Sequence, residues 1–461
     1  MSVPATSTVN RRPPGPRNII PFQALLQFRR RAPEYLQDIA RQYGDVSFFQ
    51  FGNQNAFLVN DPDVIKDVLV TSQAKFRKSR MLQRAKVLLG EGLLTSEGQF
   101  HLRQRRLAQP AFHRDRLRGY GQSMVDYALR TRDKWTAGET IDLAPEMMRL
   151  TLAVVAKTLF NADVDHEAAD IGESLSAVLE IFNTVLLPFS EYIQKLPLPS
   201  IKRFERARDR LDQTIYRIIA ERRQSAEDHG DLLSILLMAK DEDGTGGMTD
   251  TQVRDEALTI FLAGHETTAV ALTWTLYLLS QNPEVEARLH AELDRVLPNG
   301  LSPSVDDLPA LKFVEQVFAE GLRLYPPAWA IGRMVLEPYT IPGPQPWELE
   351  PGAIIIMSPY VTHRDPRYFA DPERFDPDRW LPERAEARQK FSFYPFGGGA
   401  RVCIGERFAW MEGTLLLATI AQKWRLRLDP AQVVEKRALL TLRPKHGMRM
   451  RVEARTQGIS R

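Results

Sequence analysis

Residues 396–405 read Phe-Gly-Gly-Gly-Ala-Arg-Val-Cys-Ile-Gly, and this stretch decides the fold of the 461-residue chain. It carries Cys403, the single cysteine of the sequence. The three consecutive glycines can adopt positive φ and let the backbone approach a bulky, flat partner. An apolar-periodic helix is expected over residues 404–421, with its N-terminus facing the sulfur. Amide N–H groups and the positive end of a helix favour a thiolate over a thiol, and a thiolate is a strong electron donor to iron.

Other interpretations of this loop remain open from its residues alone. A lone cysteine is commonly a small buried hydrophobe. A glycine-rich loop before a helix can bind phosphate, but no Gly-Lys-Ser/Thr follows here. A cysteine nucleophile would need a nearby histidine, and it would leave the other motifs of the chain unexplained.

The loop resembles the haem-binding loop of the cytochrome P-450 superfamily, Phe-x-x-Gly-x-Arg-x-Cys-x-Gly. Every defined position is matched, by Phe396, Gly399, Arg401, Cys403 and Gly405. With the motifs below, the resemblance extends from Pro13 to the C-terminus. It implies haem b (iron protoporphyrin IX) with Cys403 as its axial ligand. It also implies a mostly α fold with a minor β region, the cytochrome P-450 fold, with haem between a long central helix and the cysteine loop.

Composition and charge exclude several classes of protein. A hydrophobic content of 43% and a charged content of 26% are ordinary for a folded chain. A net charge of +3 without a dense Lys/Arg tract argues against a nucleic-acid-binding protein. A single cysteine excludes disulfides and cysteine-rich zinc sites, and it favours the cytoplasm. The apolar stretch 19–28 is too short for a membrane anchor, and a monomer is expected.

The chain is expected to form one large domain with a short arm. Residues 1–17 are rich in Pro, Ser, Thr and Arg and are interpreted as a flexible N-terminal arm, followed by a single haem-thiolate domain over 18–461. Two β runs at 46–51 and 55–59, parted by Gly52-Asn53, predict a hairpin. Helical spacing is found at 120–135, 146–160, 171–187, 203–225, 252–281, 283–296 and 309–323, and short strands are expected at 352–357 and 447–453.

The long helix expected over 252–281 carries one polar island, Ala263-Gly264-His265-Glu266-Thr267-Thr268. The Thr267 hydroxyl can turn toward the carbonyl of Ala263 and open a groove beside the helix. In the plain structural interpretation, Thr267 only bonds its own helix while His265 and Glu266 face solvent. A zinc-protease site is excluded because Ala269 stands where a second histidine is needed. The island resembles the acid-alcohol pair of the family, which implies that Glu266 and Thr267 deliver protons during catalysis and that Ala263 contacts haem.

Further motifs of the family supply the remaining expected site residues. Glu320 and Arg323 match Glu-x-x-Arg, and Pro372-Glu373-Arg374-Phe375 supplies Arg374 as the third member of a structural triad. Haem carboxylates need cations, and arginine suits carboxylates. The resemblance and the spacing assign this role to His101, Arg105, Arg333 and Arg401. Each of these pairs and cations could also be an ordinary solvated surface group.

The substrate pocket is expected to be apolar. By the contact regions of the family it is lined by Phe261, Ala263, Ala328, Trp329, Ile331 and Leu440, with parts of 81–94 and 178–189 as a mobile roof. Such a pocket favours medium to large lipophilic ligands, such as terpenoids, steroids or fatty acyl chains.

The implied reaction is insertion of one oxygen atom from O2 into a C–H or C=C bond by a haem-thiolate monooxygenase. The short stretch after Cys403 leads us to expect no fused reductase, so electrons would come from a ferredoxin or flavodoxin with its reductase. The arginine-rich segment 101–118 is the expected docking site for an acidic donor. A peroxide-driven peroxygenase or haem isomerase, and a non-catalytic haem sensor, remain the alternatives.

Overall fold

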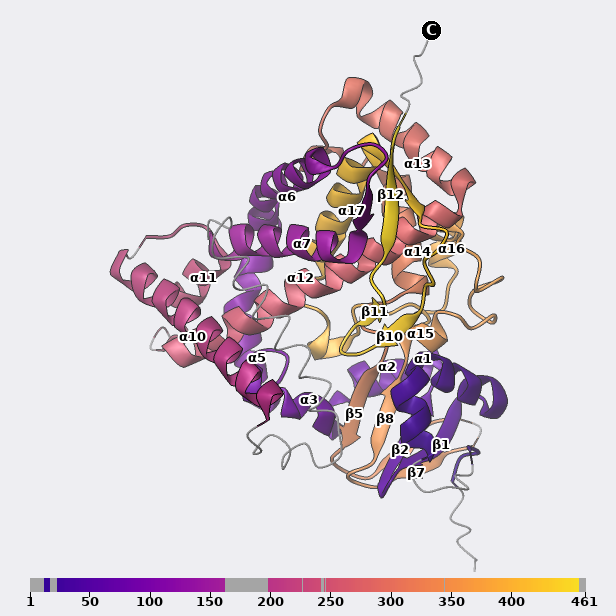
Figure 1. Ribbon diagram of the computed structural model, residues 1–461. Coiled ribbons are helices and arrows are strands. Elements are labelled where there is room, and N and C mark those ends of the chain that lie inside the picture. The colour runs from indigo at the N-terminus through magenta and orange to yellow at the C-terminus, as the bar shows by residue number, and fades with distance from the viewer. Residues whose placement is uncertain are drawn as a thin grey trace, which may run out of the picture.

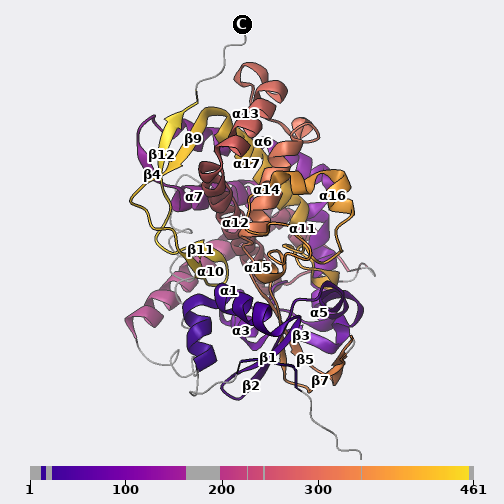
Figure 2. The same cartoon turned by 90° about the vertical axis from the view of Figure 1, so that its right-hand side faces the viewer.

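The computed structural model describes residues 12–16, 23–161, 198–225, 227–241, 244, 246–343 and 345–455. Most of the described chain is helical, and in Figure 1 α6, α7, α12, α13, α14 and α17 lie above the five-stranded sheet that contains β1, β2, β5 and β8. The mostly α fold with a minor β region is therefore confirmed. The helix α12 (Asp250–Gln281) runs through the helical region and contacts α7 (Leu143–Phe160), α14 (Lys312–Leu324) and α17 (Glu406–Lys423) (Figure 2).

The other helices follow the expected segments closely. Expected segments 120–135, 203–225 and 283–296 correspond to α6 (Arg114–Lys134), α10 (Pro199–Ser225) and α13 (Pro283–Val296). The segment 171–187 lies outside the described residues. Additional helices are α1 (Gln23–Tyr43), α2 (Pro62–Lys66), α3 (Arg80–Arg84), α4 (Lys86–Leu89), α5 (Gly98–Ala108), α11 (Leu232–Met238), α15 (Pro359–Thr362) and α16 (Pro382–Glu386). Short 3-10 turns include η6 (Pro377–Trp380) and η7 (Gly399–Arg401), and η1 (Asp67–Thr71) is a π-helix.

The main sheet has the strand order β1-β2-β8-β5-β3. Strands β1 (Val46–Phe51) and β2 (Gln54–Val59) form the expected hairpin, with Gly52 at positive φ in the turn. They are followed by β8 (Ile354–Met357), β5 (Ile331–Val335) and β3 (Phe76–Lys78). The smaller sheets join β4 (Thr140–Asp142), β12 (Arg449–Ala454) and β9 (Trp424–Leu428), then β10 (Lys436–Ala438) with β11 (Leu442–Pro444), and β6 (Tyr339–Ile341) with β7 (Trp347–Leu349).

Helix α12 is buried on nearly all sides because its sequence is apolar around most of its circumference. It begins at a capping box, in which the Thr249 side chain accepts from the backbone of Gln252 and the Gln252 side chain accepts from that of Thr249. Packing against α7, α14 and α17 then supplies the tertiary contacts that a long helix needs. The polar island is therefore presented from a rigid element.

The end of the N-terminal arm is docked on the sheet. The Phe48 amide of β1 donates to the carbonyl of Pro14 at 3.0 Å, and the Arg12 guanidinium lies over the Phe48 ring. An extended Pro-rich segment can pair with a strand edge in this way, and the flexible arm over residues 1–17 stays a prediction. Residues 1–11 and 17 lie outside the described residues.

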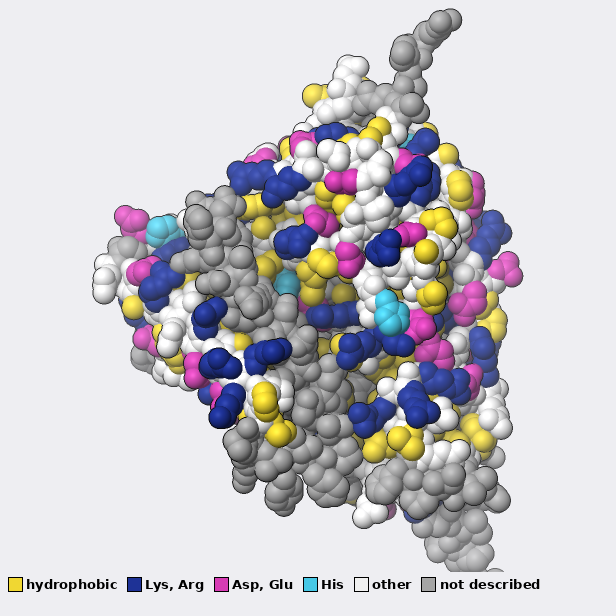
Figure 3. Space-filling view, in the orientation of Figure 1, with side chains coloured by type: hydrophobic (Ala, Val, Ile, Leu, Met, Phe, Trp, Pro, Cys, Tyr) yellow, Lys and Arg dark blue, Asp and Glu magenta, His cyan; other side chains and the backbone are white. Residues whose placement is uncertain are grey.

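The surface mixes charges of both signs. Figure 3 shows Lys and Arg side chains interspersed with Asp and Glu over this face, in agreement with the small net charge. Within the described part of the chain, no helix is long and apolar enough to cross a membrane.

Candidate active site

The cysteine loop is a tight turn whose shape depends on glycine. The Cys403 amide donates to the carbonyl of Phe396 at 3.0 Å, which folds the loop back on itself. Gly399 has φ +66, and a Cβ there would lie 1.9 Å from the carbonyl oxygen of Leu69. Helix α17 begins at Glu406, two residues later than expected, with Gly405 as its N-cap. The loop thus holds the cysteine just before a helix, as the sequence predicts.

The Cys403 side chain has exposed surface, although many protein atoms surround its sulfur. Burial among protein atoms raises its pKa to about 11, although the Gly405 N–H and the Arg105 guanidinium act in the opposite direction. A cation bound to the sulfur would act in the same direction as these two groups and favour the thiolate. Among the described residues, no group of three His, Cys, Asp or Glu side chains could hold a metal ion. A single soft ligand fits a metal whose other ligands come from a cofactor.

The polar island of α12 has the expected groove geometry. The Thr267 hydroxyl donates to the carbonyl of Ala263 at 2.8 Å, as the sequence predicts. Ala263 is exposed, and Gly264 and Thr267 are half-buried, although most of this helix is buried. A half-exposed stretch in the middle of a core helix offers a surface for a flat group.

Glu266 and His265 do not face solvent, so the plain interpretation is wrong for both. Each is almost fully buried. His265 Nδ1 lies 2.9 Å from the carbonyl of Phe261, and burial lowers the pKa of the ring. Glu266 forms an ion pair with Arg443 of β11 and accepts from the Thr441 hydroxyl, contacts that local sequence spacing could not reveal.

The expected cations come from three parts of the chain. His101 and Arg105 lie one turn apart on α5, and Arg105 Nη1 donates to the carbonyl of Val402 at 2.7 Å, next to the cysteine. Arg401 Nη1 donates to the carbonyl of Ser96 at 2.8 Å, and Nη2 pairs with Glu97. Arg333 lies on β5, and among the described residues its guanidinium contacts only the carbonyl of Gly332. Burial and neighbouring Arg401 lower the pKa of Arg333 to about 10.

Lys78 is a further cation of this cluster that the sequence analysis missed. It lies on β3 directly opposite Arg333 of β5, and its Nζ donates to the carbonyl of Leu94 at 2.6 Å. Burial, followed by Arg401 and Arg333, holds its pKa well below the usual value. Burial, followed by Arg401, Lys78 and Arg105, lowers the pKa of His101 to about 3. No local pattern marks Lys78, because a cross-strand pairing brings it to the site.

The cation cluster, defined as Lys78, Arg105, Arg333 and Arg401, interacts with only two carboxyl groups among the described residues, Glu97 and Glu256. Such an excess of buried positive charge is costly unless anions compensate it. A group that carries two carboxylates would supply that compensation. With the exposed thiol of Cys403 and the half-exposed stretch of α12, these residues fit haem.

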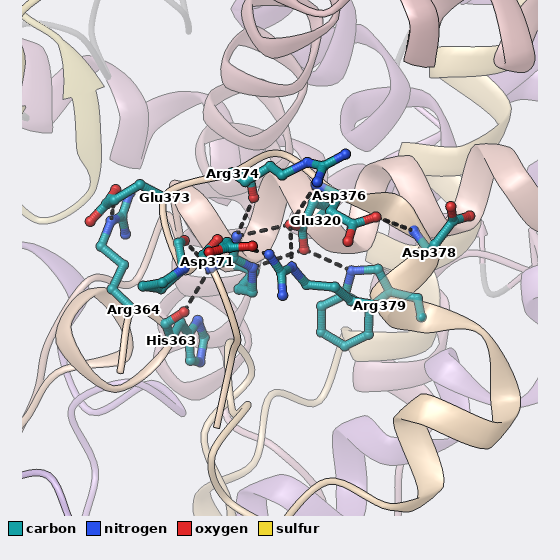
Figure 4. Close-up of polar contacts among 12 residues, drawn as sticks. Glu320, His363, Arg364, Asp371, Glu373, Arg374, Asp376, Asp378 and Arg379 are labelled. Carbon is teal, nitrogen blue, oxygen red and sulfur yellow. Dashed lines mark hydrogen bonds and ion pairs between the residues drawn. The ribbon is translucent and has the colours of Figure 1, made fainter. Parts of the chain in front are cut away.

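The structural triad differs from the expected one (Figure 4). Arg323 of α14 donates to both oxygens of the buried Glu320 at 2.8 Å, as expected. The third cation is Arg379 of η6, whose Nε lies 3.3 Å from Glu320, and the Trp380 indole also donates to this carboxylate. Arg374 is exposed and contributes only its backbone carbonyl to Arg323. The assignment of Arg374 is therefore wrong, because η6 turns the arginine five residues later into the core.

The residues expected around the substrate differ in exposure. Ala263 is exposed, and Ala328, Ile331 and Leu440 are half-buried, so these four can present side-chain surface to a ligand. Phe261 and Trp329 are nearly buried: Phe261 packs on Phe160, while the Trp329 indole donates to the carbonyl of Leu439. Their place in the pocket stays a prediction.

Part of the expected roof is tied to α12. Arg254 Nη1 donates to the carbonyl of Leu88 at 2.9 Å, and the Leu93 amide donates to Glu256 at 3.0 Å. Burial raises the pKa of Glu256 to about 8. The end of the 81–94 stretch is therefore fixed to the central helix, while 178–189 lies outside the described residues.

Comparison with known proteins agrees with the geometry. The family model described as Cytochrome P450 matches residues 13–449. The chain belongs to the cytochrome P450 family. It is 41% identical over 402 residues to "Cyclooctatin synthase" of Streptomyces melanosporofaciens, which covers 87% of each chain. It is also 37% identical over 430 residues to "Pentalenene oxygenase" of Streptomyces avermitilis, covering 93% of this chain and 94% of the relative.

A third relative is "Cyclooctat-9-en-7-ol 5-monooxygenase" of Streptomyces melanosporofaciens, 37% identical over 403 residues, covering 87% of this chain and 86% of the relative. Membership in the cytochrome P450 family makes this chain a monooxygenase, an oxidoreductase that uses O2 and a haem cofactor and acts on lipophilic substrates.

Proposed function

We propose that this cytochrome P450 binds haem b through Cys403 and inserts one oxygen atom of O2 into a terpenoid. The observation that carries the proposal is the pairing of a lone exposed thiol in a glycine-shaped loop with a cation cluster suited to two carboxylates. Bound haem would supply activation of O2, and the thiolate sulfur would donate electron density to its iron. The names of the three relatives support a terpenoid among the lipophilic classes.

The chain's own residues would hold the cofactor and move protons. Cys403 would bind iron, and Arg401, Arg333, Arg105 and His101 would lie beside the carboxylates. Thr267 would exchange its bond to the Ala263 carbonyl for a hydrogen bond into the groove, and Glu266 would take up and release the proton. Glu320 and Arg323, with Arg379, would hold the cysteine loop in place rather than take part in chemistry.

The substrate side would bind mainly by removing apolar area from water. The exposed or half-buried Ala263, Ala328, Ile331 and Leu440 carry no charge. At about 25 cal/mol per Å2 of buried apolar area, a polycyclic ligand gains more than a small polar one. This favours terpenoids, with steroids and fatty acyl chains as the other members of the lipophilic class.

The proposed bond between the haem iron and the Cys403 sulfur can be tested by spectroscopy. Reduced holoprotein with carbon monoxide is expected to show the red-shifted Soret band of thiolate haem, and Cys403→Ser is expected to lose it. If the variant kept this band, the assignment of Cys403 would be wrong.

Cyclooctat-9-en-7-ol and pentalenene are the first substrate probes, because relatives are named for them.

Turnover separates the proposal from the alternatives. With a surrogate ferredoxin, its reductase and NADH, a monooxygenase oxidises a probe and consumes reductant. Product formed with peroxide alone, and none with the ferredoxin system, would indicate a peroxygenase. Haem binding with neither kind of turnover, across a panel of lipophilic probes, would indicate a sensor.

We further propose that a ferredoxin or flavodoxin docks beside the cysteine loop, but the charge of segment 101–118 is smaller than its sequence suggests. Arg103 forms two contacts with Asp241 at 2.7 and 2.8 Å. Arg116 pairs with Asp228 at 3.2 Å, and Arg118 pairs with Asp306. Folding thus brings acids from elsewhere in the chain onto three of the arginines.

Arg114 tests this docking site better than the arginines that are paired with acids. It is exposed, and no acid pairs with it among the described residues. Arg114→Glu is expected to slow reduction by an acidic ferredoxin at low salt, and the difference should shrink at 1 M salt, where the Debye length is about 3 Å. The paired Arg116→Glu serves as the control. Wild-type reduction rates in Arg114→Glu at every salt concentration would place the donor elsewhere.

A further inference from the structure

Glu266 has an asymmetric environment. Arg443 Nε donates to its Oε1 at 2.9 Å, Arg443 Nη2 lies 2.6 Å from the same oxygen, and the Thr441 hydroxyl donates to it at 2.5 Å. The other oxygen, Oε2, is buried without a hydrogen-bond partner among the described residues. One oxygen is therefore saturated with donors, and the other is left as the place where a proton can bind.

The donors come from a hairpin that is clamped to the centre of the molecule. Thr441 and Arg443 belong to the segment that links and forms β10 and β11. The Trp274 indole of α12 donates to the carbonyl of Leu442 at 2.7 Å, and the Leu442 amide donates to that of Pro327. Because both backbone groups of Leu442 are hydrogen-bonded, the neighbouring side chains of Thr441 and Arg443 are held in a fixed position relative to α12.

The ion pair between Glu266 and Arg443 extends from the interior to the surface of the protein. The Arg443 side chain is 26% exposed, whereas that of Glu266 is 3% exposed. A carboxylate this deeply buried needs a counter-charge, and removing the partner of a buried pair leaves an uncompensated charge. Neighbouring His265 has its pKa lowered by burial and does not supply that charge. Arg443 is the guanidinium that does.

We propose that Arg443 and Thr441 are positioning residues for proton delivery by Glu266. By occupying Oε1 they supply the counter-charge of the carboxylate, fix its rotamer, and leave Oε2 to take a proton from water and pass it on toward the Thr267 hydroxyl. The carboxylate is regenerated in each cycle, so no oxidant or reductant is consumed by this step. The proposal deepens the proposed function, because it rests on Glu266 acting as the proton donor.

The first test needs no turnover. Infrared difference spectra of the holoprotein, titrated around neutral pH, are compared for wild type, Arg443→Gln and Glu266→Gln. Wild type is expected to lack the carbonyl band of a protonated Glu266, whereas Arg443→Gln is expected to show it, because a buried carboxylate without its counter-charge takes up a proton. The band must vanish in the double variant with Glu266→Gln. Identical spectra for wild type and Arg443→Gln would overturn the proposal.

Arg437→Gln is the matched control. Arg437 lies opposite Arg443 in the same hairpin, is exposed, and carries the same charge. It makes no contact with Glu266, so its spectrum is expected to equal that of wild type. If Arg437→Gln produced the same band, a general loss of positive charge or of hairpin order would explain the result, and the specific role of Arg443 would be refuted.

A kinetic readout separates positioning from simple structural support. Peroxide released per NADH is measured with pentalenene and the surrogate ferredoxin system, in H2O and in D2O. Arg443→Gln and Thr441→Val are expected to raise peroxide release roughly tenfold and to enlarge the solvent isotope effect. The effect is smaller than the roughly 100- to 10,000-fold contribution of a general acid or base, because Glu266 itself remains. Wild-type values in both variants would overturn the proposal. Absence of the thiolate Soret band from wild type would instead refute the proposed function. The infrared test does not use that band, so the failure of one proposal can be distinguished from the failure of the other.

Discussion

The corrected triad makes a sharp prediction about Arg379 and Arg374. Arg379→Gln removes one charged hydrogen bond to the buried Glu320 and the donation from Arg379 Nη2 to the carbonyl of Asp371 at 2.8 Å. Arg323 keeps both of its contacts with Glu320, so the full cost of an unpaired buried charge, about 3–5 kcal/mol, does not apply. The lost bond to a charged group costs about 1.5–3 kcal/mol and the carbonyl adds about 1 kcal/mol. We expect a destabilisation of about 2–4 kcal/mol.

Arg374→Gln is the control in the same segment. Its side chain is exposed, and the backbone carbonyl that binds Arg323 remains, so the change is expected to stay within about 0.5 kcal/mol. The measurement is urea unfolding of the holoprotein, followed by far-UV circular dichroism and by the band of the carbon-monoxide complex. If unfolding is irreversible, half-times at one urea concentration are compared instead. Equal effects of the two variants, or a larger effect of Arg374→Gln, would refute the assignment of Arg379.

Three further changes test other parts of the site. Thr267→Ala is expected to retain haem but divert electrons from product to peroxide; unchanged product per NADH would show that the hydroxyl only bonds its own helix. Gly399→Ala is expected to lower the haem content of the purified protein, because its Cβ would lie 1.9 Å from Leu69 O, whereas Gly405→Ala meets no atom closer than 3.6 Å; equal haem contents would contradict this. Burial holds the pKa of His363 well below 6.5, so below pH 6.5 the unfolded state binds more protons than the folded state and stability falls with falling pH. His363→Gln is expected to make the urea midpoint fall less steeply as the pH is lowered. A dependence of the midpoint on pH equal to that of wild type would disprove this.

Local spacing predicted the parts of the site that lie within one element. The cysteine loop and the bond between Thr267 and Ala263 follow from residues close in sequence. The placement of His101 and Arg105 on one helix follows from their spacing of one turn. In each case the period of the helix or the backbone freedom of glycine determines where the side chain lies.

Contacts between distant segments could not be predicted in this way. Two arginines follow Pro372 within seven residues, and packing of η6, not spacing, selects Arg379 for Glu320. Lys78 reaches the cation cluster through its pairing with β5. Arg443 reaches Glu266 across 177 residues of sequence. Each depends on the tertiary arrangement of short elements, whose position a single sequence does not specify.

The cation cluster also links the yield of folded protein to the supply of cofactor. Besides burial, Arg401 and Arg333 lower the pKa of Lys78, Arg401 lowers that of Arg333, and Arg105 lowers that of Arg401. Repulsion within the cation cluster therefore opposes folding until anions compensate it. A ligand that binds only the folded state adds about 4 kcal/mol of stability at a thousand times its dissociation constant. Cells that make this chain faster than they make haem are therefore expected to accumulate a form prone to unfolding and proteolysis, and feeding a haem precursor should raise the amount of intact protein before any activity is measured.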